Sequence, residues 1–261
     1  MKIALCGLGK AGMQVVRMVY GSKGELEMTA AFCRNESSNA GKCLSDVIPV
    51  KGLDCRIHPL REAGEVFARE KPDVLIDFSG KAATLQLLPH CARHGVRMVI
   101  CTTGFSEQEL ELLKTTAEET EDFSLVYAPN ITLGINVVML LADLAAQCLP
   151  DYDFAITEKH HRKKADVSAT AKKLAGHLEE RLEHPVPVNS IRAGGYVGLH
   201  EVLAVGEFER ITIIHESFSR QAFANGALIA ARYLMGRSGY FEMKDIVLDY
   251  FKKQKTAEEN S

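Results

Sequence analysis

The chain has 261 residues, of which 46% are hydrophobic and 25% charged, and its formal net charge at pH 7 is −3. These values are those of a globular protein with one large domain or two modest ones. A small negative charge excludes a global basic field for nucleic acid, and no apolar run approaches the ~20 residues that a membrane span needs. We therefore expect no nucleic-acid partner and no membrane partner.

The seven cysteines are scattered, odd in number and free of C-x-x-C pairs. This usage is typical of reduced thiols in the cytoplasm, and the N-terminus resembles a strand rather than a signal peptide. Cys91 lies near His90 and His94 on a predicted helix, but no further ligand cluster accompanies them. The sequence therefore predicts a cytoplasmic protein without a metal site.

A glycine motif follows the first predicted strand, residues 2–6. The pattern G-x-G-x-x-G lies between that strand and a helical pattern, which is the position it takes in dinucleotide-binding folds. Its glycines permit a tight turn, a close approach of the pyrophosphate and close packing of the helix on the strand. The predicted cofactor contacts here are Gly7, Leu8, Gly9, Lys10, Ala11, Gly12 and Met13.

The second predicted strand, residues 27–33, ends where NAD-selective sites carry an acidic residue. Here the residue is Cys33, and Arg34 follows it. The absence of an acidic residue and the presence of an arginine both favour a 2′-phosphate. We therefore predict NADPH as the preferred cofactor, bound in part by Arg34. NADH remains open, because Glu36 could reach a ribose hydroxyl and Arg34 could be a solvated loop residue.

Strand and helix patterns alternate through residue 130, which predicts an α/β fold with a Rossmann-like, doubly wound parallel sheet. Further strands are expected at 55–58, 73–78, 97–100 and 123–127, and helices at 62–70, 82–94 and 106–119. Ligands of such sheets bind at the carboxyl ends of the strands. The strand ends predicted to face the cofactor are Phe78 and Ser79, then Thr102, Thr103 and Gly104, then Ala128, Pro129 and Asn130.

The second half changes character. A long apolar helix is expected at 134–148, and longer strands at 154–157, 186–192, 196–205 and 209–215. These strands predict an antiparallel or mixed sheet in an α+β domain. Helices follow at 220–235 and 244–251, and the polar tail from Lys252 is expected to be frayed.

A basic stretch, residues 159–164, is followed by Asp166, Ser168 and Thr170 at the start of a helical pattern. A helix start offers free backbone N–H groups and the positive end of a dipole. Cations, two adjacent imidazoles and hydroxyls at such a place suit a small dianion that must receive a proton. The alternative is that residues 159–164 form a solvent-exposed basic surface with no ligand, as most runs of charged residues do.

The motifs together resemble those of the 4-hydroxy-tetrahydrodipicolinate reductase (dihydrodipicolinate reductase) family of the lysine and diaminopimelate pathway. The likeness runs nearly from end to end and consists of seven ordered blocks. The blocks are residues 7–12, 77–79, 102–105, 128–136, 158–166, 192–200 and 219–227.

The resemblance implies a dinucleotide-binding domain at 1–130, completed by 219–261, and a substrate-binding and oligomerisation domain at 131–218. It implies reduction of the cyclic imine or enamine of a small dicarboxylate by NADPH or NADH. It also implies a homo-oligomer, a tetramer in the family, with a dimer possible.

The same resemblance implies roles for individual residues. His160 matches the acid–base histidine, Lys164 the substrate lysine, and His161 the histidine beside the substrate carboxylates. The chemistry agrees, because hydride addition to a conjugated imine leaves a carbanion-like centre that a histidine can protonate near neutral pH. The predicted catalytic residues are His160 and Lys164, and the predicted substrate-binding residues are His161, Ser168, Ala169, Thr170 and Arg192.

One departure concerns the loop after the basic stretch. The family reads D-A-P-S-G-T-A, whereas this chain has one residue fewer, no proline, and Ala169 where the glycine is expected. Alanine resists a positive φ, so we expect a different loop shape. Two alternatives follow: a reductase or amino-acid dehydrogenase that acts on another imine or amino acid, and a non-catalytic NADP-binding sensor.

Overall fold

The computed structural model describes residues 1–50 and 54–259, with the backbone alone for 253–259. The chain forms two compact units. Unit 1 consists of residues 1–131 and 223–261, and unit 2 of residues 132–222. The divisions fall close to the predicted boundaries at 130 and 218.

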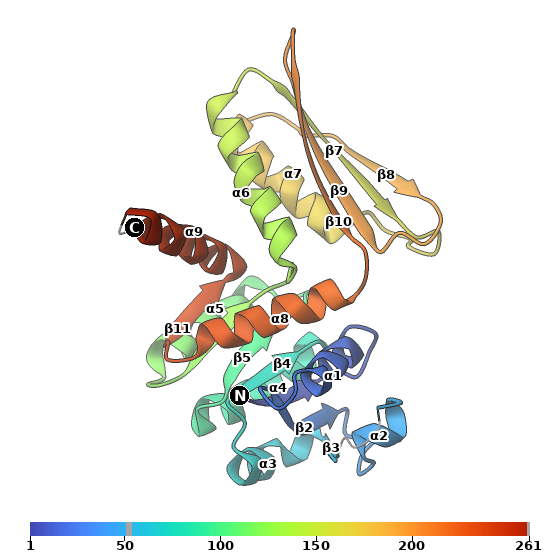
Figure 1. Cartoon of the computed structure of the whole chain (residues 1–261), viewed down its shortest axis with the longest axis vertical. Helices are drawn as coiled ribbons and strands as arrows, with labels where there is room; N and C mark the ends of the chain where they lie inside the picture. The colour runs from blue at the N-terminus through green and yellow to red at the C-terminus, as the bar shows by residue number, and fades with distance from the viewer. Residues whose placement is uncertain (51–53, 260–261) are drawn as a thin grey trace. The chain divides into compact units, whose positions relative to one another are not determined.

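Unit 1 is built on a seven-stranded parallel sheet (Figure 1), in the order β3-β2-β1-β4-β5-β6-β11. This order reverses direction beside β1, as in the doubly wound dinucleotide-binding fold. The predicted parallel sheet is therefore confirmed. Its strands are β1 (Lys2–Cys6), β2 (Glu27–Cys33), β3 (Ile57–Pro59), β4 (Val74–Asp77), β5 (Arg97–Ile100), β6 (Ser124–Tyr127) and β11 (Gly239–Glu242).

Helices cover both faces of this sheet. On one face α3, α4 and α5 pack on Ala4, Phe32 and Leu75 in one hydrophobic cluster. On the other face α1 lies against Leu5, since a Cβ on Gly12 would lie 3.7 Å from the Leu5 side chain. The helices of unit 1 are α1 (Gly12–Gly21), α2 (Leu44–Val47), α3 (Ala63–Glu70), α4 (Lys81–His94), α5 (Glu107–Glu119), α8 (Gln221–Leu234, in unit 1 from Phe223) and α9 (Met243–Glu259).

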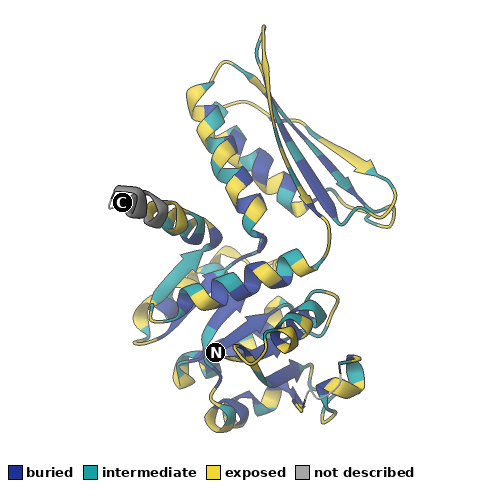
Figure 2. Ribbon diagram, in the orientation of Figure 1, coloured by how far each residue is buried: buried dark blue, intermediate teal, exposed yellow. Residues whose placement is uncertain are grey.

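Local signals in the sequence account for several element ends. The Ser106 hydroxyl accepts the Glu109 amide while the Glu109 carboxylate accepts the Ser106 amide, so a capping box starts α5. Gly95 ends α4 with φ +64°, a conformation that favours glycine. Figure 2 shows the resulting burial, with the central strands of unit 1 buried along their length.

Unit 2 is a four-stranded sheet in the order β10-β9-β7-β8, with two helices on one face (Figure 1). β7 and β8 are parallel and the other pairs antiparallel, so the predicted mixed sheet is confirmed. Side chains of α6, α7 and the strands share a second hydrophobic cluster. The elements are α6 (Leu133–Cys148), β7 (Asp153–His160), α7 (Ala169–Leu182), β8 (Val188–Arg192), β9 (Gly198–Val205) and β10 (Arg210–Ser217).

Two expectations for the C-terminal region were wrong or incomplete. The tail from Lys252 is helical as far as Glu259, because α9 continues through residues of good helix propensity. The sequence analysis also missed β11, which is four residues long and pairs with β6 at the sheet edge. Among the described residues, no helix is long and apolar enough to cross a membrane.

Candidate active site: a dinucleotide pocket and a buried carboxylate cluster

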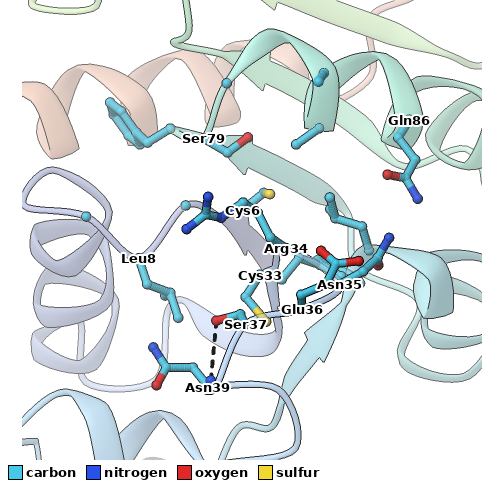
Figure 3. Close-up of a pocket in the computed structure, with 18 of the residues that line it drawn as sticks. Cys6, Leu8, Cys33, Arg34, Asn35, Glu36, Ser37, Asn39, Ser79 and Gln86 are labelled. Atoms are coloured by element: carbon cyan, nitrogen blue, oxygen red, sulfur yellow. Dashed lines mark hydrogen bonds between the residues drawn. The ribbon is translucent and has the colours of Figure 1, made fainter.

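A cavity of about 830 Å³ opens in unit 1 at the carboxyl ends of β1, β2 and β4. Figure 3 shows Leu8, Arg34 and Ser79 arranged around it. Its volume lies in the range of cofactor sites. The predicted cofactor residues that line it are Gly7, Leu8, Gly9, Arg34, Phe78 and Ser79.

The glycine turn has the close approaches that its motif requires. Gly7 has φ +93°, and a Cβ there would lie 2.5 Å from the carbonyl carbon of Phe78. A Cβ on Gly12 would lie 1.9 Å from the Gly7 carbonyl oxygen. A side chain at either position would displace backbone, so the turn can pass beneath a pyrophosphate only with glycines here. The residues therefore fit a dinucleotide.

The end of β2 borders the cavity at the position where this fold binds the ribose of a dinucleotide. Burial raises the pKa of the Cys33 thiol, so that this side chain stays neutral at pH 7. Arg34 and Glu36 are exposed side chains at the same cavity, and the Ser37 hydroxyl accepts the Asn39 amide (Figure 3). The cavity thus offers both a cation and an acid where a 2′-phosphate or a 2′-hydroxyl would lie.

The other predicted cofactor residues do not line this cavity. They still follow strands that run parallel to β1 and β4, so they lie at the same edge of the sheet. The residues outside the cavity are Lys10, Ala11, Gly12, Met13, Thr102, Thr103, Gly104, Ala128, Pro129 and Asn130.

A buried carboxylate, Asp77, ends β4 and shapes the turn that follows. Its side chain is fully buried and accepts the Ser79 amide at 2.8 Å and the Thr84 hydroxyl at 2.6 Å. Burial raises the pKa of Asp77, although these hydrogen bonds and the Ser79 hydroxyl oppose the rise. Its hydrogen-bond donors in the described chain are an amide and two hydroxyls, all uncharged, which fits a scaffold for the turn.

Unit 2 contains a different buried carboxylate. Residues of β7 alternate between buried and half-buried, which places Glu158 and His160 in one row with the core residues Phe154 and Ile156. Glu158 is fully buried and accepts hydrogen bonds from five donors. We call Glu158 and its partners the Glu158 cluster: Glu158, His160, Ser168, Ser190 and Arg192.

Arg192 makes the main contacts to Glu158. Its two terminal nitrogens donate to the two carboxylate oxygens at 2.8 and 2.6 Å. Burial alone would raise the pKa of Glu158, but hydrogen bonds from Arg192, Ser190 and His160, and from the Ser168 amide, lower it to about 2. Glu158 is therefore ionised at all ordinary pH values.

His160 lies beside this carboxylate, with Nδ1 2.5 Å from Glu158 Oε2. Burial lowers the pKa of His160 below its ordinary 6.5, and Lys164 and Arg192 lower it further, whereas Glu158 opposes the shift. A Cβ on Gly198 would lie 3.1 Å from Nε2, so a side chain there would crowd this nitrogen.

The loop that joins His160 to α7 carries the other predicted substrate residues. Lys164 and His161 are half-buried, and the Lys164 amide donates to the His161 carbonyl in a turn. Ser168 is the N-cap of α7, and its amide donates to Glu158. Ala169 and Thr170 form the first turn of α7, and the start of a helix favours an anion.

The alanine in this loop is accommodated without strain. Ala169 is the first helical residue, and the non-glycine residues with positive φ in the described chain are Lys23, Lys71, Asp122 and Glu183. Ala169 therefore takes an ordinary helical conformation, and this shorter loop does not require a positive φ at that position.

Arg192 is predicted to bind the substrate, and in the structure its guanidinium contacts other groups of the protein. Besides binding Glu158, it donates to the carbonyls of Lys164 and Asp166 at 2.9 and 2.8 Å. Its side chain is 20% exposed. In this structure its guanidinium thus holds Glu158 and the loop between His160 and α7 in place.

Two residues of this region, Glu158 and His200, have no predicted role in the sequence motifs. His200 lies opposite Glu158 on β9, its Nε2 is 2.8 Å from the Ser168 hydroxyl, and its ring packs on His160 with centroids 5.4 Å apart. Burial, together with His160 and His215, lowers the pKa of His200 to about 4. The signal that could have found Glu158 is its spacing of two residues from His160 on a strand.

No group of three or more metal-ligand side chains gathers anywhere in the described ranges.

The sequence matches two family models, "Dihydrodipicolinate reductase, N-terminus" over residues 1–131 and "Dihydrodipicolinate reductase, C-terminus" over residues 134–247. Similar proteins include 4-hydroxy-tetrahydrodipicolinate reductases from Methanopyrus kandleri and Nitrosomonas eutropha. The first is 36% identical over 94% of this chain and 95% of that protein. The second is 34% identical over 95% and 98%.

Among solved structures, a dipicolinate-bound dihydrodipicolinate reductase from Paenisporosarcina sp. TG-14 superposes with a TM-score of 0.77 and 26% identity, covering 93% of this chain and 97% of that one. An amine dehydrogenase from Mycobacterium smegmatis, at 12% identity and a TM-score of 0.68, shares the fold alone. Since the two models together span most of the sequence and the relatives match nearly end to end, this chain belongs to the dihydrodipicolinate reductase family.

Proposed function

We propose that the chain reduces 4-hydroxy-tetrahydrodipicolinate, a cyclic dicarboxylate, with NADPH preferred over NADH, in lysine and diaminopimelate biosynthesis. The reductase activity follows from the family to which the chain belongs. The observation that carries the residue assignment is His160, oriented by a buried carboxylate beside Lys164 and the start of α7.

Unit 1 binds the cofactor in this proposal. The bound dinucleotide supplies the hydride. The turn at Gly7 and Gly9 and the start of α1 receive its pyrophosphate, since a helix start with glycines admits phosphate oxygens close to backbone N–H groups. Arg34 holds a 2′-phosphate, and the neutral Cys33 thiol does not repel it. These features support a preference for NADPH.

Unit 2 binds and protonates the substrate. Lys164 and the N–H groups of Ala169 and Thr170 bind carboxylate oxygens, with His161 beside them, because a cation and a helix start both favour an anion. Hydride addition leaves negative charge on the conjugated system. His160 then donates its proton to the carbanion-like centre, and Lys164 stabilises the developing charge.

We also propose that the chain works in the cytoplasm as a homo-oligomer, a tetramer by its resemblance to the family. Exposed apolar side chains on the strands of unit 2 support an interface there, and a sedimentation experiment on the purified chain tests it. These side chains are Ile191, Val205, Ile211 and Ile214.

The test is NADPH oxidation with the freshly generated condensation product of aspartate semialdehyde and pyruvate, with NADH in parallel. We expect kcat/KM in the ordinary enzymatic range of ~10⁴–10⁸ M⁻¹s⁻¹. His160→Ala and Lys164→Ala should lower kcat ~10²–10⁴-fold while NADPH binding is retained. His177→Ala is the matched control, because His177 is a half-exposed histidine on α7.

Three outcomes would change this conclusion. Unchanged kcat in both His160→Ala and Lys164→Ala would remove the assigned roles. Absence of turnover with this substrate, together with reduction of another cyclic imine, would favour a relative with a reshaped loop. Cofactor binding without turnover on any imine would favour a sensor.

A further inference from the structure

Glu158 is more than a structural partner of Arg192, because its hydrogen bonds reach residues of three elements of unit 2. Oε2 accepts from His160 Nδ1 at 2.5 Å and from Arg192. Oε1 accepts from the Ser190 hydroxyl at 2.7 Å, from the Ser168 amide at 3.2 Å and again from Arg192. One buried side chain thus joins the end of β7, β8 and the start of α7.

These contacts fix the proton on one nitrogen of His160. An ionised carboxylate can only accept hydrogen bonds, so the Nδ1 atom that faces it at 2.5 Å must carry a proton. The proton that His160 gains and loses must then be the one on Nε2. Gly198 leaves room beside Nε2, where a Cβ would lie at 3.1 Å.

Arg192 maintains the charge that this arrangement needs. A carboxylate buried without a cation would take up a proton, and a protonated carboxyl could donate to Nδ1 instead of accepting from it. Arg192 binds both oxygens of Glu158 and two loop carbonyls, so the pair is held from β8. The charged and titratable groups around His160 are Glu158 on its own strand, Lys164 in the loop, Arg192 on β8 and His200 on β9.

We propose that Glu158 is a positioning residue that holds His160 with its proton on Nδ1, so that Nε2 is the atom that protonates the substrate. Arg192 acts indirectly, because it contacts Glu158 and keeps that carboxylate ionised. This inference rests on the proposed function, because it assigns the reacting nitrogen of the proton donor named there.

The kinetic test is Glu158→Gln, which keeps the shape of the side chain and removes its charge. The plot of kcat/KM against pH reports the free enzyme. With His160 as proton donor, kcat/KM falls as pH rises through the pKa of His160, which lies below 6.5. We expect Glu158→Gln to lower kcat ~10–100-fold. We also expect the decline of kcat/KM to begin about one pH unit lower than in the wild type, because the carboxylate that favours the imidazolium is gone. The KM for NADPH should not change.

Two comparisons separate positioning from a structural role. Glu201→Gln makes the same chemical change on β9 at a half-buried side chain, and it should leave kcat and the pH profile unaltered. In a His160→Ala background, Glu158→Gln should lower kcat less than about twofold. The reason is that the effects of substitutions do not add when the two residues act as a unit. An equal fold-loss in both backgrounds, or an unmoved pH profile, would overturn the proposal.

A second measurement does not depend on turnover or on the stability of a variant. Nitrogen-15 NMR of the histidine-labelled wild-type chain at pH 8 should show His160 protonated at Nδ1 and bare at Nε2. The opposite tautomer would overturn the proposal, whatever the activity. If the wild-type chain shows the expected tautomer but reduces no cyclic imine, the proposed function fails while the role of Glu158 toward His160 stands.

Discussion

Among the residues that the structure describes, each unit buries one carboxylate completely, and the environments of these two groups push their pKa values in opposite directions. Asp77 in unit 1 accepts hydrogen bonds from an amide and two hydroxyls, and burial raises its pKa. Glu158 in unit 2 accepts from an arginine as well, and its pKa falls to about 2. Neutral donors suffice to order a turn, whereas a cation is needed to keep a buried charge.

The difference corresponds to different tasks. Asp77 ties together the turn after β4 that passes the cofactor cavity, and it can do this with little net charge. Glu158 must stay ionised, since its charge determines the protonation of His160 in the proposed mechanism. Pairs of titratable groups whose environments separate their pKa values often mark acid–base sites.

The largest expected effect comes from removing the cation of the Glu158 cluster. Arg192→Leu leaves an uncompensated charge in the interior, which costs about 3–5 kcal/mol in the free energy of unfolding near pH 7. The folded-state pKa of Glu158 is depressed, so the stabilisation is present above the unfolded value of ~4.3 and is lost as pH falls toward about 2. The loss caused by Arg192→Leu should therefore shrink in that window. Denaturant titrations followed by circular dichroism measure the free energy of unfolding of both proteins at each pH.

Arg181→Leu is the control for this substitution. Arg181 pairs with Asp143 at 2.9 Å, but its side chain is 46% exposed. An exposed pair contributes about 0–1 kcal/mol, so this variant should lose little stability at any pH. Equal losses in Arg192→Leu and Arg181→Leu would show that burial does not distinguish the two arginines.

A smaller effect of opposite pH dependence is expected in unit 1. Asp77→Asn keeps an acceptor for the Ser79 donors, and its amide can donate to the Thr84 hydroxyl, which accepts as well as donates. The folded-state pKa of Asp77 is raised, so the wild type loses stability as pH rises through the unfolded value of ~3.9. Relative to the wild type, Asp77→Asn should therefore gain stability as pH rises from about 3 to 7.

The same denaturant titrations, run at several pH values, decide this case. A relative stability of Asp77→Asn that falls with increasing pH would mean that the ionised Asp77 stabilises unit 1, and the contrast with Glu158 would disappear.

Local patterns predicted the parallel sheet and the glycine turn because both depend on residues close in sequence. Gly7 and Gly12 are needed within one short turn, and the strands of unit 1 are buried on both faces. The short edge strand β11 was missed, since four residues that begin with Gly239 give a weak pattern.

Local patterns could have paired Glu158 with His160, two residues away on one strand, but not with the rest of the Glu158 cluster. Its contacts depend on the pairing register of three strands, which places Ser190 and His200 opposite Glu158. The basic run drew attention to residues 159–164 instead. His160 and Ser168 do belong to the cluster, but the contact of Arg192 with Glu158 follows from a register that the sequence does not display.

The smallest expected effect concerns an arginine that is exposed rather than buried. Arg34 lies at the rim of the cofactor cavity, and Glu36 lines the same cavity. Arg34→Ala should raise the Kd for NADPH ~5-fold, about 1 kcal/mol for one partly solvated contact to a 2′-phosphate. The Kd for NADH and the free energy of unfolding should not change. Isothermal titration with both cofactors measures this, and raising the salt concentration should shrink the NADPH difference. Equal weakening of both cofactors would place Arg34 at the pyrophosphate or adenine, and the preference for NADPH would then need another residue.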